Sequence, residues 1–306
     1  MTVNVLLSYA FHKKTNLNQV RDRLGTGRLL IDSGAFTAHS TGKQISLDEY
    51  AEYLQTFQDA WDYAITLDVI GDPKASQRQT RKLHSKGIPV LPVFTRGESI
   101  KEFDAMVKDV GYVAVGGGGG MNVQAGTKRM ALLQQRARDL GGGIHALGVG
   151  SYSGVKAIRP FSADSANVDN AFIFGTIQVW TGTRLLRVPV SDRDKLIAAR
   201  PHFRKSGISI AESLRTKRLP KGEGRDQLMR GMTLSYAASG EMLRRLSQTP
   251  PPDSINDVPG THLYSAVVAT IDGTLHAAED VTNGTTAPVY HQWAEEARNT
   301  SRPTRK

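Results

Sequence analysis

Three carboxylates occupy positions where a side chain could reach a shared site. Asp32 ends the apolar stretch "LLID", Asp68 ends "AITLD", and Asp164 lies in the run of small residues "FSADSANV". A carboxylate can trap an oxocarbenium-like sugar from the face opposite the leaving group, while a second acid moves a proton. We therefore expect chemistry at a glycosidic bond, with Asp164 as the nucleophile.

These signals also have structural interpretations. Aspartate in a "DSG" sequence often caps a turn through its side chain, and Asp72 before Pro73 is typical of a helix N-cap. Five glycines at residues 116–120 follow an apolar stretch, which is typical either of a plain turn or of a backbone that approaches a ligand closely. His145, inside an apolar stretch, is interpreted as a hydrogen-bonded structural histidine.

Short apolar runs alternate with helical patterns along the chain. Strands are predicted at residues 3–10, 28–36, 63–71, 89–94, 112–117, 144–150, 161–166 and 171–180. Helices are predicted after the capping-box pair Ser46 and Glu49, from Asp72 to Gly87, and over residues 99–109 and 122–140. Continuous apolar strands followed by helices are typical of a parallel sheet covered by helices. Eight units predict an α/β fold of the (β/α)8 TIM-barrel type, with an open doubly wound sheet as the alternative.

A barrel makes a prediction about the acids, because its βα loops gather at the carboxyl ends of the strands. Asp32 ends "LLID" and Asp68 ends "AITLD", each an apolar stretch within a predicted strand, and Asp164 lies in the seventh predicted strand. The glycines of "VGGGGG" and "LGVG" fall at two further strand ends. We expect these five positions to meet at one edge.

Positive charge is concentrated in one segment. The net charge is +10, and residues 183–250 hold 15 Lys and Arg against 6 Asp and Glu, whereas residues 1–182 hold 20 against 16. Such an excess is typical of a surface that binds a polyanion, with a solubilising surface as the alternative. The candidates for phosphate contacts are Arg215, Lys217, Arg218, Lys221, Arg225, Arg244 and Arg245.

The amino-acid composition limits which kinds of chemistry this protein can perform. The chain has 306 residues, of which 39% are hydrophobic, and no cysteine, which excludes disulfides, thiolate catalysis and cysteine zinc sites. We find neither a signal-peptide pattern nor a membrane-span pattern in the sequence, so we expect a cytoplasmic protein, in the host cytoplasm if a phage encodes it.

Residues 1–182 are predicted to form the barrel core, and residues 183–250 a basic helical segment that completes the barrel and binds nucleic acid. Residues 251–306 are predicted to form a linker, a β-hairpin around Asp272-Gly273 and a basic tail.

Five motifs together resemble the tRNA-guanine transglycosylase superfamily. They are "IDSGAF", "TLDVIGD", "VGGGGG", "LGVG" and "ADS", in this order, over residues 28 to about 185. The resemblance implies a barrel enzyme that exchanges guanine in a nucleic acid for a 7-deazaguanine base. One branch of the family, found in phages and bacterial gene clusters, acts on DNA instead of tRNA.

The resemblance also implies roles for individual residues. Asp164 matches the nucleophile and Asp32 the general acid and base, with Ser33 beside it. Asp68 matches the aspartate that reads the Watson-Crick edge of the purine. The remaining matches surround the base: Phe36 on one face, Leu147 on the other, and the backbone of Gly116, Gly117 and Gly148.

Two departures distinguish this chain from the tRNA enzymes: the sequence Thr95-Arg96-Gly97 stands where they carry "QGG", and no cysteine is present to build their zinc subdomain. The smaller size, the zinc-free C-terminal half and "DSGAF" in place of "DSGGF" resemble the DNA-modifying branch. We therefore expect exchange of guanine in DNA for a base such as 7-cyano-7-deazaguanine, by two displacements that need no cofactor and no metal. The expected partners are DNA and the free base, with a helper protein as a further candidate and no membrane.

Three alternatives stay open on the sequence. Base exchange in tRNA would use the same acids, and an inert nucleic-acid-binding barrel would use none of them. A carbohydrate glycosidase is disfavoured by the basic charge and by an aromatic content of 7%.

Overall fold

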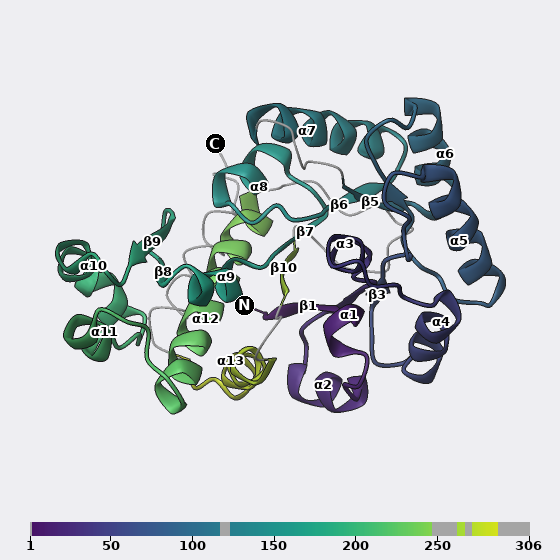
Figure 1. Cartoon of the computed structure of the whole chain (residues 1–306). Coiled ribbons are helices and arrows are strands. Elements are labelled where there is room, and N and C mark those ends of the chain that lie inside the picture. The colour runs from purple at the N-terminus through teal and green to yellow at the C-terminus, as the bar shows by residue number, and fades with distance from the viewer. Residues whose placement is uncertain (1, 117–122, 247–261, 267–270, 287–306) are drawn as a thin grey trace.

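A parallel sheet surrounded by helices positions the acids in this mixed α/β structure (Figure 1). The computed structural model describes residues 2–116, 123–246, 262–266 and 271–286. The strands of the large sheet are β1 (Asn4–Ser8), β2 (Leu29–Asp32), β3 (Tyr63–Ala64), β4 (Val93–Phe94), β5 (Tyr112–Val115), β6 (Gly143–Ala146), β7 (Ser162–Ser165) and β10 (His262–Ala266). Their order is β3-β2-β1-β10-β7-β6-β5-β4, with every neighbouring pair parallel.

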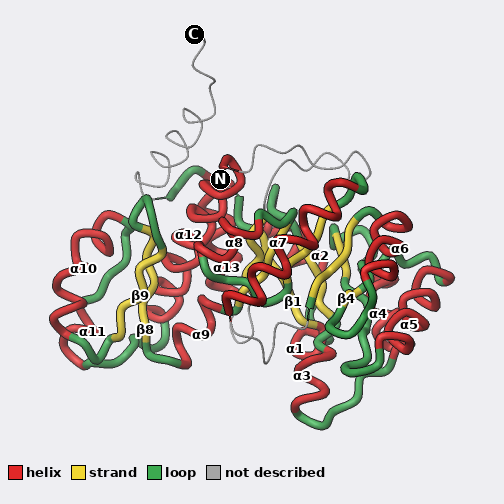
Figure 2. Tube along the Cα trace, turned by 90° about the horizontal axis from the view of Figure 1, so that it is seen from above, coloured by secondary structure: helices red, strands yellow, loops and turns green. Residues whose placement is uncertain are grey.

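Helices follow most of these strands and lie outside them. They are α1 (Tyr9–His12), α2 (Leu17–Leu24), α3 (Ala35–Ser40), α4 (Leu47–Thr56), α5 (Pro73–Ser85), α6 (Ile100–Val110), α7 (Val123–Asp139), α8 (Tyr152–Ile158) and α9 (Asn167–Ile173). In Figure 1, α2 and α4 to α8 form an arc around the strands. Figure 2 shows α1 and α3 together, projecting to one side of the strands. Among the described residues, no helix has the length and apolarity needed to span a membrane.

The region of residues 176–246, which includes most of the basic segment, adds a second, smaller sheet and three helices beside the large sheet. It contains β8 (Thr176–Trp180) and β9 (Leu185–Pro189), which pair antiparallel, followed by α10 (Arg193–Lys205), α11 (Ala211–Thr216) and α12 (Glu223–Leu246). Helix α13 (Ile271–Asn283) packs against α12 and α2. In Figure 1, α12 stands between the large sheet and the α10–α11 pair.

Local capping signals explain where several helices begin. The Asp72 side chain accepts a hydrogen bond from the Ala75 amide at 2.9 Å, and Pro73 occupies the first turn of α5. The Ser46 hydroxyl accepts one from the Glu49 amide at 3.3 Å. These contacts satisfy amides that have no partner within the helix. The four helices predicted over residues 46–140 are confirmed, since the structure has α4, α5, α6 and α7 at these positions.

The eighth predicted strand is wrong, and so is the C-terminal hairpin. Residues 171–180 divide between α9 and β8, and β8 is not part of the large sheet. The place between β1 and β7 is taken by β10, while Asp272-Gly273 lies in the first turn of α13. An inserted strand exchanges ladder hydrogen bonds with two neighbours, whereas a hairpin strand has one. The predicted linker at residues 247–260 and the basic tail lie outside the described residues.

The alternation of side chains along the strands puts acids and apolar residues on one face. Leu6, Leu30, Val93, Tyr112 and Ala114 come from four strands and pack in a single buried cluster. Two residues farther along, Ser8 and Asp32 lie on the same face as Leu6 and Leu30, and they pair in register. The apolar cluster therefore forms a floor beneath the carboxyl ends of the strands.

The two edge strands of the large sheet approach each other. Ile65, directly after β3, forms a parallel bridge with Leu91, shortly before β4. The Leu91 amide donates to the Ala64 carbonyl at 2.7 Å, and the Thr66 amide donates to the Leu91 carbonyl at 2.9 Å. Backbone groups at these edges are therefore paired with each other.

An ion-pair network fastens the entry to β2. The carboxylate of Asp62, whose side chain is 14% exposed, forms ion pairs with Arg21 and Arg28, the latter at 2.6 Å. It also accepts a hydrogen bond from the Leu29 amide at 2.7 Å. Arg21 in turn donates to the carbonyls of Ala60 and Gly27 at 2.8 and 2.7 Å. The network joins α2 to the strand that carries Asp32.

We expect Asp62→Ala to lower the free energy of unfolding by about 2 kcal/mol or more, because a hydrogen bond to a charged group contributes about 1.5–3 kcal/mol. Urea denaturation measures the change. The control is Asp59→Ala, which removes an exposed carboxylate three residues away. Equal stability of the two variants would contradict a structural role for the network.

Candidate active site

Asp32 is the last residue of β2, and its side chain stabilises the turn that leads into α3. Its Oδ2 accepts a hydrogen bond from the Gly34 amide at 2.9 Å, which is the side-chain turn expected of "DSG". Gly34 has φ +78, and a Cβ there would lie 2.4 Å from the Ala10 Cβ. Only glycine fits this turn, because other residues would be strained and would collide with α1. The turn thus fixes the carboxyl of Asp32 at the carboxyl end of β2.

The ionisation of Asp32 is perturbed by its surroundings. The pKa of Asp32 is raised from 3.8 to about 7. Burial is the largest cause, followed by the charges of Asp164 and then Asp68. The Gly34 amide and the Ser8 hydroxyl oppose the shift. An acid with a pKa near 7 can both donate and accept a proton at neutral pH. Asp32 therefore has the property needed by a residue that acts in turn as acid and base.

Asp68 follows β3 and joins Asp32 at the same edge. Burial raises its pKa from 3.8 to about 6, against a hydrogen bond from its own backbone. The buried Tyr50 lies beneath this loop, where its hydroxyl donates to the Ile65 carbonyl at 2.7 Å. Burial, with Asp32 as the next contributor, raises the pKa of Tyr50 well above 10, so its phenol stays protonated beside the acids.

Asp164 occupies the third position of β7 and is held from β6. Its Oδ1 accepts a hydrogen bond from the Gly148 amide at 2.6 Å and lies 3.3 Å from Nε2 of His145. The Asp164 side chain is 13% exposed, and Gly148, in the left-handed region at φ +70, turns its amide toward it. The structure thus brings the three predicted acids together, close enough for charge coupling with Asp32.

The residues predicted to surround a base are distributed unevenly. Gly116 is buried, and a Cβ there would lie 3.4 Å from Leu147 Cδ1, which places these two residues side by side. Ser33 is fully buried within the α3 turn. Phe36 is 73% exposed on α3, so no protein group covers most of its ring. Gly117 lies outside the described residues.

The loop after β4 is fastened by residues that the sequence did not single out. Arg129 of α7 donates to the Thr95 carbonyl at 3.1 Å and packs its guanidinium 5.4 Å from the centre of the Phe94 ring. The Glu98 carboxylate accepts hydrogen bonds from the Thr95 amide and hydroxyl at 2.6 and 3.0 Å. Arg96 itself is exposed. Arg129 and Glu98 therefore shape the segment Thr95-Arg96-Gly97, and spacing alone gave no signal for either.

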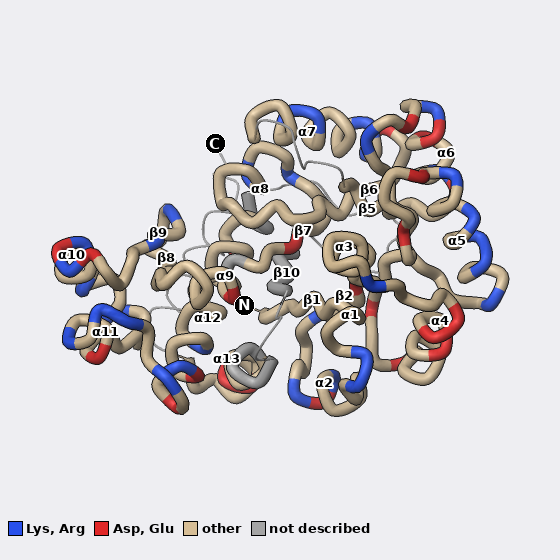
Figure 3. Tube along the Cα trace, viewed as in Figure 1, with Lys and Arg blue, Asp and Glu red and all other residues tan. Residues whose placement is uncertain are grey.

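The basic residues are less concentrated in space than in sequence. Figure 3 shows Lys and Arg on α10 and α11, but also on the outer helices α2, α5 and α7. Of the predicted phosphate contacts, Arg215, Lys217, Arg218 and Lys221 are exposed. Arg225 is half-buried, with its guanidinium 4.8 Å from the centre of the Phe172 ring, which indicates a packing role. The side chains of Arg244 and Arg245 lie outside those described.

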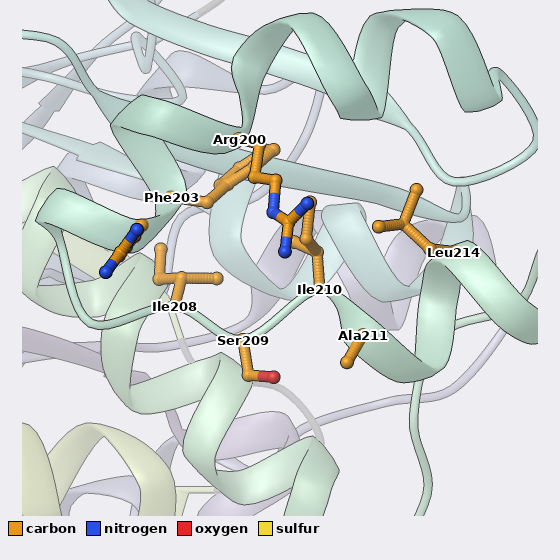
Figure 4. A pocket seen from close by; sticks show the side chains of 8 residues that line it. Arg200, Phe203, Ile208, Ser209, Ile210, Ala211 and Leu214 are labelled. Atoms are coloured by element: carbon orange, nitrogen blue, oxygen red, sulfur yellow. The ribbon is translucent and has the colours of Figure 1, made fainter.

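A cavity of about 190 Å³ lies in this basic segment between α10 and α11 (Figure 4). Its wall is apolar at Phe203, Ile208 and Ile210, while the exposed Arg200 and Arg204 border it. It contains none of the three acids. We therefore place the chemistry at the strand ends and regard this cavity as a feature of the basic surface.

Further exposed side chains at the carboxyl ends of the strands escaped the sequence prediction. Phe11 on α1 is 47% exposed, and Lys13 and Lys14 beside it are exposed too. Helix α1 contacts α3, which carries Phe36. The two exposed aromatic rings thus come from adjacent helices. A signal was present in "AFHKKTN", where an aromatic residue precedes two lysines, but it lies in a different part of the chain from the basic segment.

No protein-family model matches the chain, and no curated protein does. In the described part of the chain, no group of three or more histidine and carboxylate side chains is arranged to hold a metal ion. Function is therefore inferred from the acids and their surroundings.

The pKa of Asp32 predicts a pH-dependent stability. Because its pKa is about 7 in the folded protein and 3.8 without burial, its neutral form stabilises the fold fully below about pH 4, and this contribution is lost as the pH rises through 7. We expect Asp32→Asn to be more stable than wild type at pH 8, by on the order of 1.4 kcal/mol per unit of pKa difference, and equally stable at pH 4. Urea unfolding at both pH values measures this, with the exposed Asp59→Asn as control. A difference that does not change with pH would contradict the shifted pKa.

Proposed function

We propose that this protein is a DNA-guanine transglycosylase, which exchanges guanine in DNA for a 7-deazaguanine base. The observation that carries the proposal is the meeting of Asp32, Asp68 and Asp164 at one edge of a parallel sheet, with the pKa of Asp32 raised to about 7. A nucleophile, a proton-transferring acid and a recognition acid are what base exchange requires. The resemblance of "IDSGAF", "LGVG" and "ADS" to the transglycosylase family supports the same assignment.

The proposal includes a closed (β/α)8 barrel. The bridge between Ile65 and Leu91 links the two edge strands of the sheet. Leu30 of β2 and Tyr112 of β5 share one buried cluster although they stand near opposite ends of the strand order. Both observations favour a sheet that curves back on itself, because in a flat sheet these strands would be too far apart to pack. In such a barrel, β10 is the eighth strand.

The chemistry proceeds by two displacements at the same sugar carbon. In the first, a carboxylate oxygen of Asp164 bonds to C1′, the bond from C1′ to the guanine nitrogen breaks, and Asp32 gives its proton to the departing guanine. In the second, Asp32 removes a proton from the incoming 7-deazaguanine, whose nitrogen bonds to C1′ as the ester bond to Asp164 breaks. Both acids return to their starting states. Each displacement inverts the carbon, so the overall reaction retains its configuration.

Asp68 provides selectivity for guanine in this proposal. A carboxylate accepts hydrogen bonds from the N1–H and 2-amino groups of guanine, and adenine lacks this pair of donors. With a pKa of about 6, the side chain is mostly ionised at neutral pH. A buried charged acceptor left without a donor is costly, so the wrong base is disfavoured.

A base inside a duplex must leave the stack before these acids can reach its sugar. The exposed ring of Phe36 and the half-buried Leu147 are available to contact an extruded base. Phe11 and Lys13, on and beside the adjacent helix α1, are available to the flanking strand. We infer that α1 and α3 contact the polymer close to the reacting nucleotide, while the basic segment contacts it farther away.

Mass spectrometry of nucleosides tests the reaction. Cells expressing the chain with a supply of 7-cyano-7-deazaguanine are expected to accumulate a deazaguanine deoxynucleoside in DNA. Asp164→Ala should abolish the product, because the sugar then has no nucleophile. DNA and tRNA are digested separately. Product in tRNA alone would replace the DNA assignment with base exchange in tRNA, and product persisting in Asp164→Ala would contradict the role of this acid.

Salt dependence tests the predicted phosphate contacts. We expect the fourfold alanine variant of Arg215, Lys217, Arg218 and Lys221 to bind duplex DNA more weakly. The slope of log K against log salt should become shallower by about 0.9 for each phosphate that the variant no longer neutralises. The matched control is the fourfold alanine variant of the exposed residues Lys74, Lys82, Lys101 and Lys108 on α5 and α6. Equal weakening in the two variants would indicate a general effect of net charge and contradict a localised site.

A further inference from the structure

A chain of polar side chains crosses three strands beneath the site and ends at Asp164. The hydroxyl of Tyr112 on β5 is hydrogen-bonded to the hydroxyl of Ser162 on β7. Ser162 Oγ lies 2.5 Å from Nδ1 of His145 on β6, and Nε2 of His145 lies 3.3 Å from Asp164 Oδ1. His145 and Ser162 are completely buried and Tyr112 is 2% exposed. This series of three side chains is therefore shielded from bulk water.

The direction of the hydrogen bonds follows from electrostatics. If Tyr112 donates to Ser162 and Ser162 donates to Nδ1 of His145, then Nε2 carries the imidazole proton and presents it to the Asp164 carboxylate. In the opposite direction, Nε2 would present a lone pair to a carboxylate oxygen 3.3 Å away, and the two would repel. Burial also raises the pKa of Tyr112 well above 10, so the phenol keeps its proton and can begin the chain.

The chain and Gly148 act on the same oxygen of Asp164. The Gly148 amide donates to Oδ1 at 2.6 Å, and Nε2 of His145 approaches Oδ1 as well. Because the Gly148 amide holds Oδ1 and Nε2 of His145 lies beside the same oxygen, Oδ2 is the oxygen that we expect to bond to a sugar carbon. A nucleophile constrained in this way loses little entropy on reaching its reactive geometry.

Packing fixes the far end of the chain. The ring of Tyr112 stands edge-on to Tyr63 and Phe161, with ring centres 5.2 and 4.9 Å away. Gly143 faces Phe161, and a Cβ there would lie 2.9 Å from the Phe161 Cβ. Tyr112 therefore has little room to move, which makes it a rigid anchor for Ser162 and His145.

We propose that Tyr112, Ser162 and His145 are positioning residues that hold Asp164 Oδ1 so that Oδ2 faces the sugar. With its proton on Nε2, His145 presents an N–H toward Oδ1 and so orients the carboxylate. This inference rests on the proposed function and names groups beyond the three acids.

The test separates positioning from binding and from folding. Wild type and variants are mixed with guanine-containing DNA in the absence of the incoming base, so that the second displacement cannot follow, and the covalent adduct that survives denaturation is measured over time. The dissociation constant for DNA and the free energy of unfolding are measured in parallel. We expect His145→Leu to slow adduct formation by roughly 10-fold to 100-fold with an unchanged dissociation constant. His145→Gln, which can present an amide N–H to Asp164, should recover part of the rate.

Two further variants protect the test against loss of folding. Tyr112→Phe removes only a hydroxyl at the far end of the chain of hydrogen bonds from Asp164, so it should fold and still slow adduct formation. His84→Leu makes the same substitution at a half-buried histidine whose Nε2 contacts the Val90 carbonyl at 2.8 Å, and it should leave the rate unchanged.

The outcomes are distinguishable. Adduct formation in wild type, at rates that neither His145→Leu nor Tyr112→Phe changes, would overturn the positioning role and leave the proposed function intact. An equal loss in His84→Leu would likewise overturn it. Absence of an adduct in wild type with both DNA and tRNA would overturn the proposed function itself and, with it, this inference.

Discussion

The burial of carboxylates beside one another at the carboxyl edge of the sheet is the constraint on which the rest of the site depends. Asp32 would ionise near pH 4 in water, but burial and two neighbouring acids raise its pKa to about 7. Such an arrangement costs folding free energy at neutral pH, since each unit of pKa difference corresponds to about 1.4 kcal/mol. The scaffold must therefore hold these acids together against their own electrostatics.

Backbone amides and strand pairing provide that support. Gly34 and Gly148, both at positive φ, direct their amides to Asp32 and Asp164 at 2.9 and 2.6 Å. Asp164 lies opposite Tyr264 of β10, whose insertion beside β1 completes the connection between the strands of Asp32 and Asp164. A strand formed near the C-terminus thus joins two halves of a site whose residues come from the first 164 positions.

The proposed function requires different properties of two parts of the molecule, the carboxyl ends of the strands and the basic segment. Base exchange needs an enclosed site with fixed protons, and the strand ends offer half-buried acids above an apolar floor. Polymer binding needs an exposed cationic surface, and the segment with α10 and α11 offers arginines around an open cavity. The exposed Phe11 and Phe36 come from the adjacent helices α1 and α3, and in the proposed function they contact the polymer.

Local sequence determined much of this protein. Seven of the eight strands of the large sheet, the capped helices and the acids at or near strand ends could be predicted, because each depends on neighbouring residues: a side chain that caps a turn, or an apolar run that pairs in a sheet. The charge excess of residues 183–250 was equally visible, although its folded position was not.

Tertiary structure decided the rest. The sequence around Asp272-Gly273 favours a hairpin locally, yet β10 pairs with β1 and β7 and α13 follows, because a strand between two partners forms more backbone hydrogen bonds. His145 was interpreted as a structural histidine, and its contacts with Ser162 and Asp164 exist only because β6 and β7 lie in register. The pKa of Asp32 likewise depends on residues 36 and 132 positions away along the chain. Local patterns specify elements, whereas long-range pairing specifies which side chains meet.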